Sequence, residues 1–193
     1  DEPILYDEDF DEMDQPEERM CHLSKNKLDS KKDSSTYQLI NASKLEEGEQ
    51  PLGRVIGYKN QKKELLSVID WFKHSKELKE KGVSIPKGVI LFGEPGNGKS
   101  LLIKEIIRCC EAPVFVFQGG QINVAEGICE TFDKARETGH AIIIFDELDL
   151  LINDERRVVR ALQENLDGVE STDDILVIAA TNYIREIPDP LLR

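Results

Sequence analysis

Several signals that would assign a function directly are missing from the 193-residue sequence. It contains no HExxH motif, and its three histidines have no carboxylate or histidine partner at metal-ligand spacing, so it holds no zinc-hydrolase signature. The four cysteines show no CxxC spacing; we interpret them as free thiols in a reducing compartment and expect a cytoplasmic location. No apolar run approaches the ~20 residues of a membrane span, and no signal-peptide pattern opens the sequence.

Positive charge is also scarce. Lys and Arg total 25 against 38 Asp and Glu, which gives a net charge of −13. This excess of negative charge argues against nucleic acid or an anionic membrane surface as the main partner. It does not exclude a single phosphate ligand, which needs only a local site. The apolar content of 39% is enough for a packed core, and the length suits one domain with an appended segment.

Residues 1–50 are predicted to form an acidic, flexible N-terminal segment. Residues 1–20 are an acidic block with interleaved apolar side chains, which is typical of a disordered linker or, alternatively, of a docking segment that orders on a partner. We interpret the apolar patch at 37–40 as the end of a small upstream element. Order is expected from Leu52, so residues 52–193 are the second predicted domain.

From residue 60 onward the apolar pattern alternates between helix and strand periods. A helix is predicted from Asn60 to Lys81, with Leu65, Ile69 and Phe72 on its inward face. Apolar runs predict strands at 88–94, 113–119, 141–147 and 175–182, separated by helices at 98–110, 124–138 and 155–166. This alternation is typical of an α/β fold, in which helices cover both faces of a parallel sheet and ligands bind at the carboxyl ends of the strands.

The stretch GEPGNGKS at 93–100 matches the phosphate-binding pattern GxxxxGK[S/T], between a predicted strand and a predicted helix. Its glycines let backbone N–H groups turn toward phosphate oxygens, and the helix N-terminus adds the positive end of a dipole. Lys99 is predicted to bridge the β- and γ-phosphates, and Ser100 to ligate Mg²⁺. The predicted nucleotide-binding residues of this loop are Glu94, Pro95, Gly96, Asn97, Gly98, Lys99, Ser100 and Leu101.

Two further strand ends carry polar side chains. In IIIFDE at 142–147, Asp146 is predicted to hold the Mg²⁺ shell and Glu147 to polarise an attacking water as general base. Asn182 ends the fourth strand, and its amide would reach the γ-phosphate and the water if that strand lies between the other two. We interpret Asp149 and Asp154 as surface or interface charges.

These stretches resemble those of an AAA+ ATPase of the AAA subfamily. Three further stretches share the resemblance: VIGYKNQKKEL (55–65), RRVVRALQENLDGVE (156–170) and VIAATNYIREIPDPLLR (177–193). The nearest group in character contains the membrane-anchored zinc proteases and their soluble relatives. The resemblance implies a P-loop NTPase with a five-stranded parallel sheet in the order 5-1-4-3-2. It also implies adenine near Ile56 and Gly57, a sensor role for Asn182, and ATP with Mg²⁺ as ligands.

The resemblance further implies assembly into a ring. In the family, an arginine pair reaches across the ring interface to the neighbour's γ-phosphate, and Arg193 matches the first of that pair. Such a charge is worth about 10³–10⁵ in rate in related enzymes. We therefore expect a homo-oligomeric ring, a hexamer, acting on an unidentified protein partner. The fifth strand, the helical lid and the second arginine would follow residue 193, so we expect a truncated piece with weak turnover.

Two loops depart from the family pattern. The loop at 119–132 is shorter than the substrate-gripping pore loop of threading members and has no aromatic residue before Phe132, which we assign to the buried face of the next helix. The second pore loop shrinks to NDERR at 153–157. These departures weaken the prediction of an unfoldase, although a variant loop could still thread a polypeptide by other contacts.

Two hypotheses for function stay open. The first is an Mg-ATP-dependent ATPase that remodels or regulates a protein partner. The second is a nucleotide-gated assembly or binding module with little or no hydrolysis, which the short loops favour and the Asp146–Glu147 pair opposes. A P-loop kinase or GTPase is disfavoured, because no GTPase base-recognition motif or kinase lid is visible.

Overall fold

The computed structural model describes residues 36–41, 45–117, 123–152, 156–168 and 174–192. The chain divides into two units, Asp1–Lys31 and Lys32–Arg193, and all of the described residues belong to the second. Within these ranges, no helix combines the length and the apolar character needed to span a membrane.

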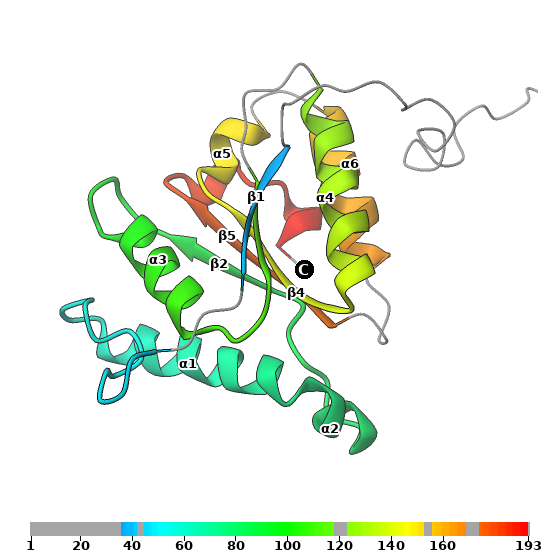
Figure 1. Ribbon diagram of the computed structural model, residues 1–193. Helices are drawn as coiled ribbons and strands as arrows, with labels where there is room; N and C mark the ends of the chain where they lie inside the picture. The colour runs from blue at the N-terminus through cyan, green and yellow to red at the C-terminus, as the bar shows by residue number, and fades with distance from the viewer. Residues whose placement is uncertain (1–35, 42–44, 118–122, 153–155, 169–173, 193) are drawn as a thin grey trace, which may run out of the picture. The chain divides into compact units, whose positions relative to one another are not determined.

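A mixed five-stranded sheet forms the centre of the second unit (Figure 1). Its strands, in spatial order, are β1 (Tyr37–Ile40), β3 (Val114–Phe117), β4 (His140–Phe145), β5 (Asp174–Thr181) and β2 (Gly88–Phe92). The strands β3, β4, β5 and β2 are parallel, whereas β1 pairs antiparallel with β3. The predicted α/β class is therefore confirmed.

The prediction of a wholly parallel sheet is wrong in one respect. The four parallel strands follow the 1-4-3-2 part of the expected order 5-1-4-3-2, but the fifth strand seen is the antiparallel β1, at the opposite edge from β2. Its residues fall within the predicted N-terminal segment 1–50. Pairing with β1 satisfies backbone groups that β3 would otherwise expose at the sheet edge. In the described part of the chain, no parallel strand pairs with the outer edge of β2.

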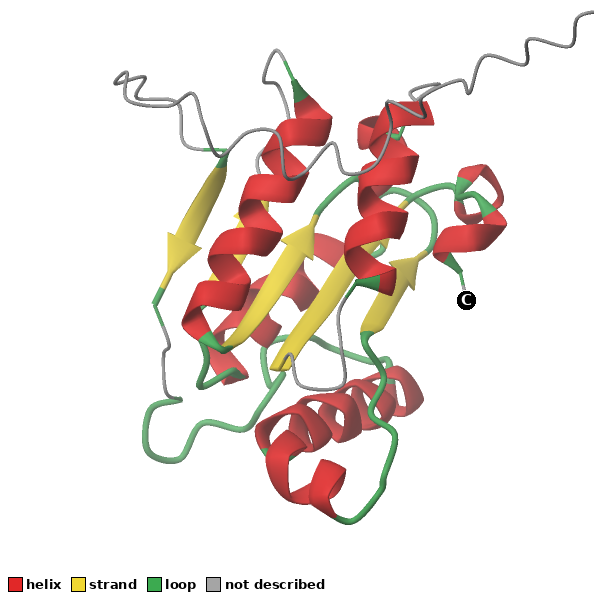
Figure 2. Cartoon of the chain, turned by 90° about the vertical axis from the view of Figure 1, so that its right-hand side faces the viewer, coloured by secondary structure: helices red, strands yellow, loops and turns green. Residues whose placement is uncertain are grey.

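Helices cover both faces of the sheet (Figure 2). They span Lys59–Lys73 (α1), Ser75–Glu80 (α2), Lys99–Cys109 (α3), Val124–Thr138 (α4), Leu148–Leu151 (α5) and Arg156–Asp167 (α6). The helices α1 and α3 lie on one side of the strands, and α4 and α6 lie on the other (Figure 1). This layering buries β4 and β5 on both faces, as their continuous apolar runs predict, whereas β2 at the sheet edge is only partly buried.

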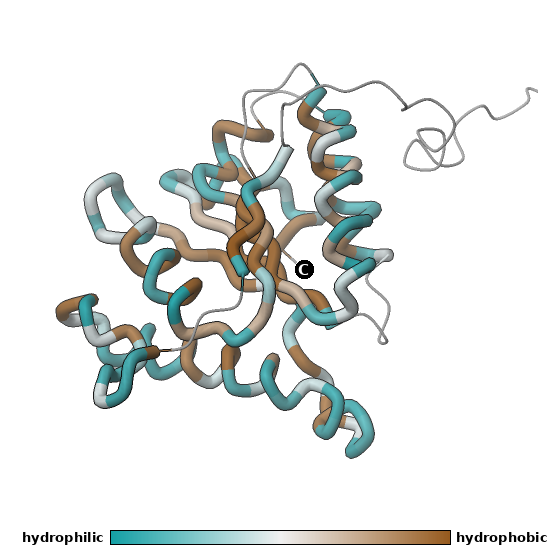
Figure 3. Tube along the Cα trace, viewed as in Figure 1, coloured by the Kyte–Doolittle hydropathy of each residue, from teal (hydrophilic) through white to brown (hydrophobic). Residues whose placement is uncertain are grey.

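Alternate side chains of β4 enter the two halves of the core. Ile142 and Ile144 are fully buried in one apolar cluster with Ile106 of α3. Phe145 faces the other side, where its ring centroid lies 6.2 Å from that of Phe132 in α4. Phe132 is 0% exposed, which confirms its assignment to a buried helix face. Figure 3 shows the strands as the most hydrophobic part of the trace, with hydrophilic positions on the outer turns of the helices.

Helix boundaries agree with the prediction for α4 but not for the first helix. In α4, the Asn123 side chain caps the first turn by accepting from the Glu126 N–H at 3.4 Å, and Gly139 follows the last turn with φ 73°. The helix predicted over 60–81 is two helices, since His74 between them adopts φ −103° and ψ 22°. The buried Ser75 lies directly after this break.

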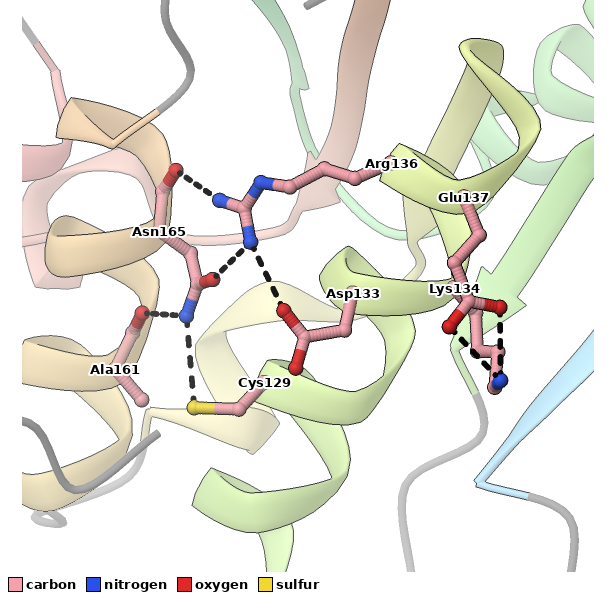
Figure 4. Close-up of polar contacts among 7 residues, drawn as sticks. All are labelled: Cys129, Asp133, Lys134, Arg136, Glu137, Ala161 and Asn165. Carbon is pink, nitrogen blue, oxygen red and sulfur yellow. Dashed lines mark hydrogen bonds and ion pairs between the residues drawn. The ribbon is translucent and has the colours of Figure 1, made fainter. Parts of the chain in front are cut away.

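A polar network joins α4 to α6 (Figure 4). The Arg136 guanidinium donates to the side-chain oxygen and to the main-chain carbonyl of Asn165, each at 3.3 Å. Asn165 is only 4% exposed, and its side-chain amide donates to the Ala161 carbonyl at 2.8 Å. Because buried polar groups require partners, this network favours one packing arrangement of the two helices over others.

The cysteines differ from one another. Cys109 and Cys110 are free and buried, as expected. Burial raises the pKa of the Cys110 thiol to about 12, so this thiol stays protonated and unreactive at neutral pH. Cys129 is disulfide-bonded, so the expectation of a free thiol is wrong there. Cys21 lies outside the described residues.

The start of β1 packs closely on α4. Thr36 is 5% exposed and its hydroxyl donates to Glu130 Oε2 at 2.7 Å. A Cβ added at Gly127 would lie 2.5 Å from Thr36 Cγ2 and 3.3 Å from Phe117 Cε2. A glycine at position 127 therefore allows the N-terminal strand to approach the helix.

We expect Gly127→Ala to lower the free energy of unfolding by about 1–2 kcal/mol, because overpacking outweighs the helix propensity gained with alanine. The double variant Gly127→Ala/Thr36→Ser removes the clashing Cγ2 and keeps the hydroxyl bond to Glu130, so it should recover most of that loss. Urea denaturation of the parent and of both variants measures this. Equal stability of Gly127→Ala and the parent would contradict the close approach.

Candidate nucleotide site

The glycine-rich loop lies between β2 and α3. Gly96 and Gly98 have φ angles of 83° and 77°, in the left-handed region that favours glycine. Gly98 is the N-cap of α3, and its carbonyl accepts the first helical bond from the Leu102 N–H at 2.9 Å. The loop therefore ends at the N-terminus of an eleven-residue helix, where unpaired N–H groups can bind an anion.

Lys99 folds back over this loop. Its ammonium donates to the Gly93 carbonyl at 2.7 Å and to the Glu94 carbonyl at 3.0 Å. An ammonium has three donors, so these bonds both hold the loop closed and keep the positive charge at its centre. Phosphate oxygens could replace the carbonyls as acceptors without moving the backbone.

Residues 56–58 lie beside the same loop. Tyr58, with φ 53°, donates its hydroxyl to the Asn97 carbonyl at 3.1 Å. Gly57 precedes it with φ 83°, and Ile56 is 92% exposed, which is unusual for a large apolar side chain. The proposed adenine-binding pair is thus tied to the phosphate-binding loop through its neighbour Tyr58.

The acidic pair follows β4. Asp146 comes directly after the strand, and its Oδ1 accepts from the Glu147 N–H at 3.1 Å. Glu147 is the N-cap of α5 and adopts φ 54° and ψ 50°, a left-handed conformation that non-glycine residues rarely take. Such backbone strain is often found where a side chain has a functional orientation.

The end of β5 completes the arrangement. β5 lies between β2 and β4, so Asn182 follows the strand that separates the loop from the acidic pair. The interpretation of Asp149 as a surface or interface charge is wrong, because Asp149 is only 5% exposed. Its Oδ1 accepts from the Thr181 hydroxyl at 2.7 Å and from the Asn182 N–H at 3.0 Å. Asp154 lies outside the described residues.

One cavity of about 340 Å³ brings the three strand ends together. Its lining residues are Pro95, Gly96, Gly98, Lys99, Ser100, Leu101, Asp146, Glu147, Ala180, Thr181 and Asn182. Of the predicted site residues, Glu94, Asn97, Ile56 and Gly57 are not in this lining. Arg193 lies outside the described residues, and so do 118–122 and 153–155, which include the start of the first short loop (119–132) and most of the second (153–157).

The donor atoms in this cavity suit Mg²⁺. No group of three His, Cys, Asp or Glu side chains that could hold a metal exists in the part of the chain that the structure describes. Mg²⁺ does not need one, because it is usually bound by one or two protein oxygens together with water and substrate phosphates. The Ser100 hydroxyl and the Asp146 carboxylate line the same cavity and are oxygen donors of this kind.

The comparison with known families agrees with this geometry. The family model for the ATPase family associated with various cellular activities (AAA) matches residues 89–193, more than half of the chain. The chain belongs to the AAA family. AAA membership confirms the resemblance drawn from the motifs and makes the fold that of a P-loop NTPase; the family itself is described as one of ATPases.

Curated relatives are AAA proteins of greater length. The ATP-dependent zinc metalloprotease FtsH of Ureaplasma parvum is 33% identical over 153 residues, which cover 72% of this chain and 21% of that protein. FtsH of Cyanidium caldarium is 34% identical over 156 residues, covering 72% and 25%. A cell division cycle protein 48 homolog of Archaeoglobus fulgidus is 34% identical over 153 residues, covering 71% and 21%. The chain thus spans 21–25% of the length of these relatives.

Sequence reasoning missed three residues of this site. Tyr58 could have been suspected, because it directly follows the predicted adenine-binding pair. Thr181 gave a weaker signal, as a hydroxyl at the end of an apolar strand. Asp149 gave none, because α5 is only four residues long and its inward face cannot be read from so short a pattern.

We expect Tyr58→Phe to raise the Kd for ATP about 2–10-fold, since it removes one hydrogen bond to the loop that is worth about 0.5–1.5 kcal/mol. Titration with a fluorescent ATP analogue measures this. The matched control is Tyr37→Phe in β1, which is separated from β2 by three strands and should leave the Kd unchanged. Equal affinities of the two variants would show that the Tyr58 hydroxyl does not support the loop.

Proposed function

We propose that this AAA chain binds and hydrolyses Mg-ATP and uses the reaction to remodel or regulate a protein partner. The observation that carries the proposal is the single cavity in which the Lys99–Ser100 loop, the Asp146–Glu147 pair and Asn182 meet. These are the charges and donors that phosphoryl transfer to water requires: cations for the phosphates, a base for the water and an amide for the γ-phosphate.

Phosphate binding falls to the loop and the helix behind it. The N–H groups at the start of α3 would donate to the phosphate oxygens, and Lys99 would exchange its carbonyl partners for β- and γ-phosphate oxygens. When bound, Mg²⁺ would neutralise part of the phosphate charge, with the Ser100 hydroxyl and the Asp146 carboxylate holding it or its waters. The adenine base of the nucleotide would contact residues 56 and 57.

Glu147 would act on the water. Glu147 lines the cavity next to Asp146. Its carboxylate would accept a proton from the water that attacks the γ-phosphorus. Asn182 would donate its side-chain amide to a γ-phosphate oxygen or orient the same water. Both residues follow neighbouring strands, so their spacing is set by the sheet.

The assembled form is part of the same proposal. The chain would act in a homo-oligomeric ring, a hexamer, in which Arg193 approaches the γ-phosphate of the next subunit. Sequence relatives include proteins whose names are ATP-dependent zinc metalloprotease and cell division cycle protein 48 homolog. The metalloprotease name supports a protein partner rather than nucleic acid, as does the net charge of −13. A cytoplasmic location and the division into 1–50 and 52–193 stay predictions.

A second candidate is a nucleotide-gated assembly module with little or no hydrolysis. The short loops at 119–132 and 153–157 favour it, because they offer little to grip a polypeptide. The meeting of Lys99, Ser100, Asp146, Glu147 and Asn182 in one cavity favours the ATPase. Turnover of the full-length protein distinguishes the two.

We expect Glu147→Gln to lower kcat for ATP at least 100-fold while its Kd for ATP stays within about threefold, because the amide cannot take a proton but fills the same space. Lys99→Ala should lose detectable ATP binding, since it removes the charge at the centre of the loop. Phosphate release and equilibrium titration measure the two effects in the full-length protein.

The matched control is Glu80→Gln, an exposed glutamate at the end of α2, which should change neither quantity. Unchanged turnover in Glu147→Gln would contradict the assigned base. Absence of turnover in the parent, with ATP-dependent assembly intact, would support the second candidate instead.

A further inference from the structure

A buried carboxylate lies behind the site without lining its cavity. Asp149 belongs to α5, two residues after Glu147, and is 5% exposed. A single oxygen, Oδ1, accepts both from the Thr181 hydroxyl at 2.7 Å and from the Asn182 N–H at 3.0 Å. Burying a carboxylate costs free energy unless it is well hydrogen-bonded. Asp149 is therefore not a surface charge that keeps a helix soluble, and its burial needs another explanation.

These bonds connect the segments that carry Glu147 and Asn182, the two side chains proposed to act on the water and the γ-phosphate. Glu147 is the N-cap of α5 after β4, and Asn182 directly follows the neighbouring strand β5. The strands themselves are in register only up to the pair Phe145–Ala179. Beyond that pair, the Asp149 side chain of α5 accepts hydrogen bonds from Thr181, the last residue of β5, and from Asn182, which follows it.

The hydroxyl of Thr181 extends the connection by one more bond. Thr181 is 0% exposed; its hydroxyl donates to Asp149 and accepts from the Tyr183 N–H at 3.0 Å. The backbone N–H groups of Asn182 and Tyr183 are thereby bonded to the buried side chains of Asp149 and Thr181, which are bonded to each other. The turn that carries the Asn182 amide is fixed relative to α5.

Glu147 needs such support. It holds a left-handed φ of 54°, which is strained for a residue with a Cβ, and the four-residue α5 has too few internal bonds to be stable by itself. Leu148 is buried, but an apolar contact can slide, whereas two hydrogen bonds to one oxygen set position and direction. The hydrogen bonds that Asp149 accepts therefore hold α5, and with it the strained Glu147, in a fixed position against β5.

We propose that Asp149 is a positioning residue that fixes the Glu147 carboxylate and the Asn182 amide relative to each other through Thr181. The inference rests on the proposed ATPase function and assigns a role to a residue that does not line the cavity. Its consequence is that geometry, and not the negative charge of Asp149, is what the site requires. A misplacement of about 1 Å can cost about 100-fold in rate.

The test uses two substitutions of Asp149 in the full-length protein. Asp149→Ala removes both acceptor contacts and should lower kcat for ATP at least 10-fold, with the Kd for a non-hydrolysable ATP analogue changed less than about threefold. Asp149→Asn keeps an Oδ1 that can accept both bonds and should retain kcat within about threefold. If Asp149→Asn is as impaired as Asp149→Ala, the charge acts directly and the positioning role is wrong.

Asp174 provides the matched control. It is equally buried, at 4% exposed, but it lies at the first residue of β5 and pairs with Lys79 at 2.5 Å, at the far end of the strand from Asn182. Asp174→Asn should lower thermal stability and leave kcat within about twofold. A loss of kcat in Asp149→Ala no larger than that in Asp174→Asn would overturn the proposal, because the effect would then be general destabilisation.

A second readout does not depend on turnover. Amide exchange of residues 182 and 183 should accelerate in Asp149→Ala and in Thr181→Val, and not in Asp174→Asn. The preference for the non-hydrolysable ATP analogue over ADP should fall by up to about threefold in the first two variants, because Asn182 no longer holds its place at the γ-phosphate. Unchanged amide exchange and unchanged nucleotide preference in these two variants would overturn the positioning role. If both variants show the two effects but the parent protein has no turnover, only the proposed hydrolysis is contradicted.

Discussion

The parallel pairing of β2, β5 and β4 is the constraint on which the rest of the site depends. Parallel strands end at the same edge of a sheet, so the glycine loop after β2, Asn182 after β5 and Asp146 after β4 meet in one cavity. The order matters as much as the direction, because β5 lies in the middle. Exchange of β5 and β4 would move Asn182 one strand further from the loop, an additional distance of about 4.8 Å.

Much of this could be predicted from the sequence, because the signals are local. Continuous apolar runs identified the four parallel strands, and the spacing of glycine, lysine and serine identified the loop at 93–100. The family resemblance supplied the relative order of those strands, which periodicity alone does not contain. The roles given to Ile56, Gly57 and Arg193 came from the same resemblance and stay predictions.

The features that escaped prediction depend on tertiary contacts. The strand β1 is the apolar patch at 37–40, interpreted from the sequence as the end of a small upstream element. Its pairing partner lies more than seventy positions away, at Val114–Phe117, so no local pattern shows that it belongs to this sheet. The break at His74 interrupts a run with good helical periodicity, because the chain bends where Ser75 becomes buried. Asp149 looked like a solvated charge until the fold placed it under Thr181. In each case, packing decided against the local preference.

The central proposal is that one cavity at the carboxyl edge of the sheet holds the side chains that act on ATP: Lys99, Ser100, Asp146, Glu147 and Asn182. The most direct measurement is a structure of the full-length protein with Mg²⁺ and a γ-phosphate mimic. The account predicts Lys99 Nζ and the Asn182 amide within about 3 Å of γ-phosphate oxygens, and a water between Glu147 and the γ-phosphorus. A nucleotide bound elsewhere, or a γ-phosphate that Asn182 and Glu147 do not approach, would contradict it.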